Sequence, residues 1–250
     1  MKIKTTFISA KLMIISLVLA ISTFNANSQT AEEWLEQGVI ALENNDYQKA
    51  IEYFEKAIKL EPNAAAAYNN MGSAYYAWNE QYEKAIECYK KAVKYKPDYA
   101  GAYFNMGLAY KNWNGQYEKA IECYKKAIKL EPNDADAYLN MGNAYYALNG
   151  QYEKAIECYK KAIELEPNDA DAYFNMGNAY QLWNGQYQKA IGCYEKAIEL
   201  EPNYASAYLN MGYAYEKSGN QNQAIECYKK AVALGSEAAN EFFLDNGISF

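Results

Sequence analysis

The side chains best suited to covalent chemistry are the five cysteines, Cys88, Cys123, Cys158, Cys193 and Cys227. A thiol becomes a nucleophile when a neighbouring base or positive charge removes its proton, and histidine is the usual partner. The 250-residue chain contains no His, its 24 basic residues are all Lys, and it has no glycine-rich phosphate-binding loop. We therefore expect a protein that is not an enzyme and that uses no cofactor.

The spacing of the cysteines argues against disulfides and against a metal site. Successive cysteines lie 35 residues apart, or 34 for the last step, so each holds the same place in a repeated unit. Neighbouring helices pack roughly 8–10 Å apart, whereas a disulfide requires Cα atoms within about 7 Å. We predict unpaired thiols that serve as small apolar side chains, with no metal bound.

The regular spacing of the cysteines implies a repeated unit, and the prolines recur with the same period. They lie 35 residues apart, and each is followed by Asn or Asp, a short Ala-rich stretch, a Tyr and then Met-Gly. The prolines are Pro62, Pro97, Pro132, Pro167 and Pro202. A fixed period of this length is typical of a solenoid built from small supersecondary units.

Each unit contains two segments with helical periodicity. Tyr138, Met141 and Tyr145 recur at helical spacing in one segment, and Ala155 and Tyr159 do so in the next. The proline after the second segment ends that helix, and the Asn or Asp that follows can cap the next one. One pair of helices cannot bury its apolar stripe alone, so neighbouring pairs must stack.

The pattern closely resembles the tetratricopeptide repeat family, which has an aromatic residue near the start, an apolar residue with Gly, and then Tyr, Ala, an aromatic residue, Ala and Pro. In the first unit these places hold Trp34, Gly38, Ala50, Phe54, Ala57 and Pro62; in the fourth they hold Tyr138, Met141, Gly142, Tyr145, Ala155, Tyr159, Ala162 and Pro167. The resemblance implies an all-α, right-handed superhelical solenoid of six helix-turn-helix units with a C-terminal capping helix.

The repeats divide the chain after its N-terminal segment. Residues 31–238 hold six expected units, which are 31–64, 65–99, 100–134, 135–169, 170–204 and 205–238. Residues 239–250 are expected to form the capping helix and tail, with Phe242 and Phe243 buried. The middle units are one residue longer than the family's usual period, and the extra residue falls in turns such as Trp113 to Gln116. Asn-Gly within these turns favours left-handed backbone.

Residues 1–28 have the layout of a secretory signal. Lys2, Lys4 and Lys11 are followed by an apolar run from Leu12 to Phe24 and by small residues that end at Ser28. The run is shorter than the ~20 residues that a membrane-spanning helix needs. We expect cleavage after Ser28, a periplasmic or secreted location and no stable membrane insertion afterwards; the alternative is an uncleaved anchor. On the basis of this segment we expect an exported, bacterial-type tetratricopeptide repeat protein.

Net charge excludes some partner classes. The formal net charge is −7 and the sequence pI is about 4.9. Binding to nucleic acid or to anionic lipid requires clustered cations, so we expect neither kind of partner. We expect a protein or peptide partner and a monomeric chain.

The resemblance also implies where a partner would bind. In this family the first helices line a concave groove, and an asparagine ladder can hold a peptide backbone there, because a carboxamide both accepts and donates hydrogen bonds. The ladder positions hold Asn70, Asn105, Asn140, Asn175 and Asn210. Asn143 and Asn178 lie one turn further along the same face, and Tyr76 and Tyr146 can add stacking surface. The same asparagines can instead serve packing or solubility.

Three functions remain open from the sequence. The first is a non-catalytic scaffold that binds peptide segments of an envelope protein in its groove. The second is a glycan-binding or cell-wall-binding module, because aromatic rings and carboxamides also suit sugars. The third is self-assembly, against which the polar C-terminal end argues. The cationic clamp of chaperone-binding family members is absent, since its positions hold Phe104, Leu139 and Phe174.

Overall fold

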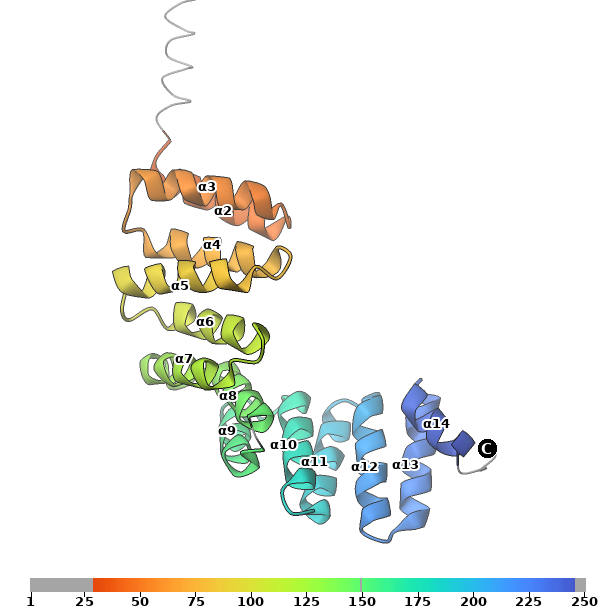
Figure 1. The fold of residues 1–250 in the computed structure, drawn as a ribbon. Helices are drawn as coiled ribbons and strands as arrows, with labels where there is room; N and C mark the ends of the chain where they lie inside the picture. The colour runs from red at the N-terminus through yellow and green to blue at the C-terminus, as the bar shows by residue number, and fades with distance from the viewer. Residues whose placement is uncertain (1–28, 149, 246–250) are drawn as a thin grey trace, which may run out of the picture. The chain divides into compact units, whose positions relative to one another are not determined.

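The computed structural model describes residues 29–148 and 150–245, and every regular element within them is a helix (Figure 1). Consecutive helices form helix-turn-helix pairs, so the prediction of an all-α solenoid is confirmed. None of the described helices has the length and apolar composition to cross a bilayer. The expected signal segment, residues 1–28, lies outside the described residues.

The helices fall into two compact units, one ending at Pro97 and one beginning at Asp98. The first unit contains two pairs: α2 (Ala31–Glu43) with α3 (Tyr47–Leu60), and α4 (Ala65–Ala77) with α5 (Tyr82–Tyr95). The second unit contains four pairs and one last helix: α6 (Ala100–Asn112) with α7 (Tyr117–Leu130), α8 (Ala135–Ala147) with α9 (Tyr152–Leu165), α10 (Ala170–Leu182) with α11 (Tyr187–Leu200), α12 (Ala205–Lys217) with α13 (Gln221–Ala233), and α14 (Glu237–Asp245).

The first helices of successive pairs lie along one face of each unit. Besides packing on its own second helix, α8 contacts both α6 and α10, and α10 also contacts α12. In the first unit α2 contacts α4 in the same way. Side chains that project from this row of helices therefore come together although they are more than thirty residues apart in the sequence.

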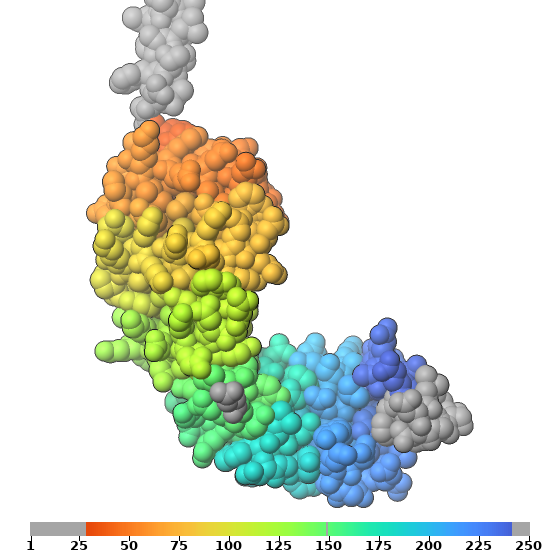
Figure 2. All heavy atoms as spheres, in the orientation of Figure 1, coloured from red at the N-terminus to blue at the C-terminus, as the bar shows by residue number. Residues whose placement is uncertain are grey.

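The core of each pair is built from alanines and one large ring on the second helix. In the fourth pair Ala155 is fully buried and Tyr159 is 1% exposed. The ring lies against Gly142 of the first helix, where an added Cβ would come within 2.6 Å of Tyr159 Cε1. Gly142 thus allows the two helices to approach with the ring between them. The space-filling view shows the heavy atoms of successive helices in contact within each unit (Figure 2).

The longer turns adopt the left-handed backbone that the Asn-Gly sequences predict. Asn114 has φ 54° and Gly115 has φ 63°. The next residue closes the turn, because Gln116 Nε2 donates to the Trp113 carbonyl oxygen at 3.1 Å and Lys119 Nζ donates to Gln116 Oε1 at 2.7 Å. The extra residue is thereby contained in the turn. Other non-glycine residues with positive φ in these turns are Asn79, Glu80 and Asn184.

The C-terminal end of the second unit is covered by α14, which packs on α13. Ala239 of α14 is fully buried, and its backbone N–H donates to Ser236 Oγ at 3.3 Å. The Ser236 hydroxyl therefore caps the N-terminus of α14. In the earlier pairs the corresponding turn after the second helix contains a proline. The side chains of Phe242 and Phe243, and residues 246–250, lie outside the described part of the chain.

Candidate functional site

A polar pocket opens on the first-helix face of the second unit. Its lining residues are Asn143 and Tyr146 of α8, Tyr159 of α9, and Asn175 and Asn178 of α10, and its volume is about 280 Å³. All five side chains are neutral near pH 7, and each offers hydrogen-bonding atoms. Four of the nine residues predicted for the groove are therefore brought into one site.

Buried phenols hold two of these amides in place. Tyr159 Oη donates to Asn143 Oδ1 at 2.8 Å, and Tyr194 Oη donates to Asn178 Oδ1 at 2.8 Å. Because the phenol occupies the amide oxygen, the Nδ2 group of each amide remains the donor for another acceptor. We call these pairs the phenol–amide pairs. They fix the amide orientation before any ligand arrives, which lowers the ordering cost of binding.

Both phenols remain donors across the physiological range. Burial raises the pKa of Tyr159 and of Tyr194 above the ordinary value for tyrosine, and neighbouring tyrosine and cysteine side chains add to the increase. A protonated phenol beside an amide oxygen can only donate to it. The direction of the Tyr159–Asn143 bond is therefore fixed, whereas the single Tyr194 proton has two acceptors, Asn178 Oδ1 at 2.8 Å and Gln181 Oε1 at 3.3 Å.

The sequence places Tyr159 at the aromatic position of its repeat and gives no role to its hydroxyl, which holds Asn143. The signal lay in the pairing of residue types sixteen apart. Tyr89 lies 3.3 Å from the Ser73 hydroxyl, at the place where Tyr159 meets Asn143, whereas Phe54, which has no hydroxyl, follows Val39 at a similar spacing. The third pair departs from this pattern, because the residue sixteen positions before the phenol Tyr124 is the apolar Leu108.

The predicted asparagine ladder is not a row of equivalent free amides. Asn175 lines the pocket, but Asn140 Oδ1 accepts from Lys111 Nζ at 2.9 Å and Asn140 Nδ2 donates to its own helix at the Asp136 carbonyl. Asn210 Nδ2 donates to Asn178 Oδ1 at 2.8 Å. These asparagines have distinct partners because the neighbouring first helices carry different side chains.

The other predicted residues lie elsewhere. Asn105 lies on α6 of the second unit. Asn70 and Tyr76 belong to α4 of the first unit, where Asn70 Oδ1 accepts from Asn69 Nδ2 at 3.2 Å and the Tyr76 ring packs edge-on against Tyr82 at 5.4 Å. Because its rungs belong to two different units, a five-rung ladder stays a prediction. Tyr146 has the same edge-on geometry against its neighbouring ring, Tyr152, at 5.5 Å.

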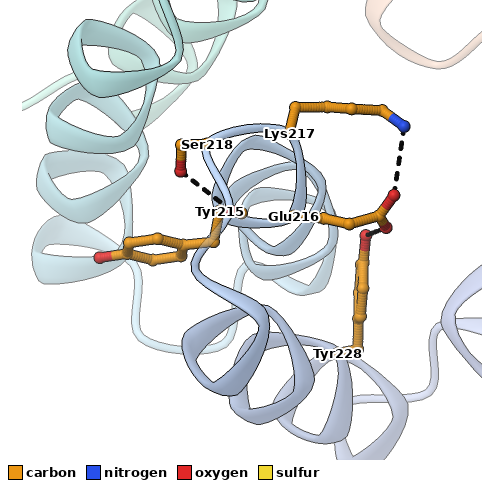
Figure 3. A network of polar contacts seen from close by, with 5 residues as sticks. All are labelled: Tyr215, Glu216, Lys217, Ser218 and Tyr228. Atoms are coloured by element: carbon orange, nitrogen blue, oxygen red, sulfur yellow. Dashed lines mark hydrogen bonds and ion pairs between the residues drawn. The ribbon is translucent and has the colours of Figure 1, made fainter.

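The last pair replaces the phenol–amide pair with a charged network (Figure 3). Tyr228 Oη donates to Glu216 Oε2 at 3.0 Å, and Lys217 Nζ lies 3.2 Å from Glu216 Oε1. Lys217 also lies over the ring of Tyr213, 5.0 Å from its centroid. The amide-lined part of the face therefore ends at α12.

A second hollow, of about 250 Å³, lies in the first unit between α2 and α3. It is lined by Gln37, Ile40, Ala41, Asn44, Asp46, Lys49 and Tyr53. These residues include a charged pair, Asp46 with Lys49 at 3.9 Å, and no phenol–amide pair. The two amide side chains of this hollow, Gln37 and Asn44, are not held by a tyrosine hydroxyl among the described residues, so we place the candidate site on α8 and α10.

The cysteines are free and buried, as predicted. Burial raises the pKa of Cys88, Cys193 and Cys227 to about 11 and that of Cys158 to about 12. Such thiols stay protonated near pH 7 and are poor nucleophiles. In the described part of the chain no three side chains of the metal-binding types come together.

Family models match nearly the whole array of pairs. Models described as tetratricopeptide repeat match residues 31–64 and 205–236, and a model described as TPR repeat matches 79–112, 114–149, 146–182 and 184–219. No curated protein matches the chain.

Solved structures include several similar solenoids. A crystal structure of MamA is 32% identical and covers 68% of this chain and 97% of its own, with a TM-score of 0.62. YrrB, described as a TPR protein with an unusual peptide-binding site, is 27% identical over 74% of this chain and 93% of its own, with a TM-score of 0.64. Pseudomonas aeruginosa PilF, at 19% identity, covers 86% and 97% with a TM-score of 0.71, and shares the fold.

Proposed function

The chain belongs to the tetratricopeptide repeat family, and from this premise we propose that it is a non-catalytic binding protein whose second unit holds an extended peptide segment of a partner protein. The observation that carries the proposal is the pocket in which Tyr159 and Tyr194 orient Asn143 and Asn178. Oriented amide donors beside a hollow suit the carbonyl groups of a peptide backbone together with one side chain.

The spacing of the first helices suits an extended peptide. Neighbouring helices lie roughly 10 Å apart, and an extended chain rises ~3.3 Å per residue. Each first helix would then meet about every third peptide residue. A single amide contributes about 1 kcal/mol, so the binding free energy is spread along α8 and α10.

The similarity to YrrB supports this class of function, because YrrB is described as having a peptide-binding site. For the present chain the supporting observation is its own pocket. The partner we propose is a protein segment that lacks regular structure when free, since an extended backbone exposes the groups that the amides recognise.

The alternative function is a module that binds glycan chains or cell wall. Tyr146 favours it, because its ring lines the pocket beside asparagine side chains and a sugar ring can stack on an aromatic face. The two functions differ in the ligand that competes for the pocket, so soluble glycan fragments can serve as the competitor in a peptide-binding experiment.

We also propose that the chain is exported and works outside the cytoplasm as a monomer. The support is the basic, apolar and small-residue order of residues 1–28. Mass spectrometry of the protein from its native cells should find Gln29 as the first residue. An intact Met1 terminus would rule out a cleaved signal and leave the uncleaved anchor. Sizing at several concentrations tests the monomer.

The peptide proposal can be tested with a displayed library of short random peptides and the purified chain. We expect enrichment with the wild type and a large loss of binding with the double variant Asn143→Ala, Asn178→Ala. The matched control is Asn133→Ala, Asn168→Ala, which removes two exposed amides from the turns between pairs. Equal binding by both variants would place the binding face elsewhere. Competition by glycan, with no peptide enriched, would support the alternative.

A further inference from the structure

Lys111 places one positive charge at the edge of the amide-lined face. It lies on the last turn of α6, half-buried, and its Nζ atom donates to Asn140 Oδ1 of α8 at 2.9 Å. Burial lowers the pKa of this amine from the ordinary lysine value. The α6–α8 junction therefore carries a desolvated cation whose hydrogen-bonding partner is neutral.

Other lysines of this unit have their charge balanced or exposed. Lys161 pairs with Glu164 at 2.6 Å, and Lys196 pairs with Glu199 at 2.8 Å. For Lys111 no ion pair is found among the described residues, and the acid that follows on the same junction, Asp136, gives only its backbone carbonyl to Asn140. A partly buried charge is costly unless it is paired. The position thus lacks the anion that would complete it.

The amine of Lys111 has hydrogen-bond donors available for that anion. A lysine amine has three N–H donors, and Asn140 accepts from one of them. The amide is itself tied to α8 through Asp136, so it holds the amine toward the face. A carboxylate accepts hydrogen bonds from an ammonium group more strongly than a neutral oxygen does.

We propose that Lys111 binds the carboxylate of an acidic side chain, Asp or Glu, in the peptide held by α8 and α10. This inference rests on the proposed function and adds to it a charge preference and a register. The Lys111 junction lies on the α6 side of α8, and the pocket lies on the α10 side. Crossing one helix spans about three residues of an extended peptide, so the acid stands about three residues from the side chain that fills the pocket.

The preference is for one acid at one end of the site. Toward α12 the face carries Glu216, which is already neutralised by Lys217 at 3.2 Å. The chain as a whole has a net charge of −7, which repels a polyacidic peptide. A peptide with one carboxylate, placed at the α6 end, meets the Lys111 charge there and avoids the repulsion that a polyacidic peptide would experience.

The experiment uses the same displayed peptides against the full chain and two variants. Wild type should enrich Asp or Glu at one position of the selected peptides. Lys111→Met, which keeps most of the length of the side chain, should lose that enrichment. Lys129→Met removes an exposed lysine of α7 and serves as the charge-matched control, which should keep it.

Affinities of one selected peptide then complete the test. Replacing its acid by the corresponding amide should weaken binding to wild type about tenfold and leave binding to Lys111→Met nearly unchanged. Acid enrichment that survives in Lys111→Met would overturn the Lys111 assignment while the peptide function stands. Failure of wild type to enrich any peptide would overturn both. Circular dichroism confirms that the variants fold.

Discussion

The pairs α8–α9 and α10–α11 differ from the last pair, α12–α13, in what their common tyrosine meets. Tyr159 and Tyr194 donate to asparagine oxygens, whereas Tyr228 donates to the Glu216 carboxylate. All three rings occupy the same place against a first-helix glycine. The repeat therefore keeps its packing constant and changes only the polar group at the end of the ring.

This difference shows how one fold can carry a site over part of its length. A neutral amide held by a phenol keeps a donor for a ligand, while a carboxylate held by Tyr228 and Lys217 is satisfied within the protein (Figure 3). The packing core and the face of the first helices can thus be perturbed separately. Substitutions in the core should have the largest effects, and substitutions on the face smaller ones.

Gly142→Ala should have the largest effect, because it strikes the packing that all pairs share. An added Cβ would lie 2.6 Å from the Tyr159 ring, so the ring or the helix must move. We expect a loss of about 1–3 kcal/mol in the free energy of unfolding, measured by denaturant titration. Gly192→Ala is the control, since nothing lies within 4 Å of its added Cβ; it should stabilise by roughly 0.5–1 kcal/mol. Equal effects would contradict this account of the core.

The second-largest effect should be a loss of stability at alkaline pH. The folded pKa values of Cys158, Cys193 and Cys227 are raised to about 12, 11 and 11 by burial, above the value of about 8.5 for a free thiol. Stability from these groups is complete below the unfolded pKa and is lost as the pH rises toward the folded values. The melting temperature should therefore fall steadily above about pH 9. Replacing Cys158 and Cys193 by Ala should flatten the decline; an unchanged slope would assign it to other groups.

The repeat and its helices could be predicted from the sequence, because proline, glycine and tyrosine at a fixed period determine where each helix ends and what it packs against. The cysteines were placed in the core for the same reason. The phenol–amide pairs join residues sixteen apart, such as Tyr159 and Asn143, and the periodic pattern does not show which rotamer each adopts. The Lys111 contact with Asn140 depends on helix stacking and was likewise missed.

Tyr159→Phe and Tyr228→Phe should have smaller effects that differ between the two regions. Each removes one hydroxyl and costs about 1 kcal/mol of stability. The first also frees Asn143 to rotate and should weaken binding of a selected peptide, whereas the second should leave that binding unchanged. Fluorescence anisotropy with the labelled peptide measures both. Equal loss of peptide affinity in the two variants would remove the distinction between the regions.

The most direct test of the central claim is site-specific photocrosslinking of a selected peptide. A photoreactive benzophenone side chain is placed at Tyr146, which lines the pocket, or at Glu157, which is exposed on α9. Peptide held on the first-helix face should crosslink at the first position and not at the second. Crosslinking at Glu157 with none at Tyr146 would contradict the account, because the peptide would then lie on the second helices.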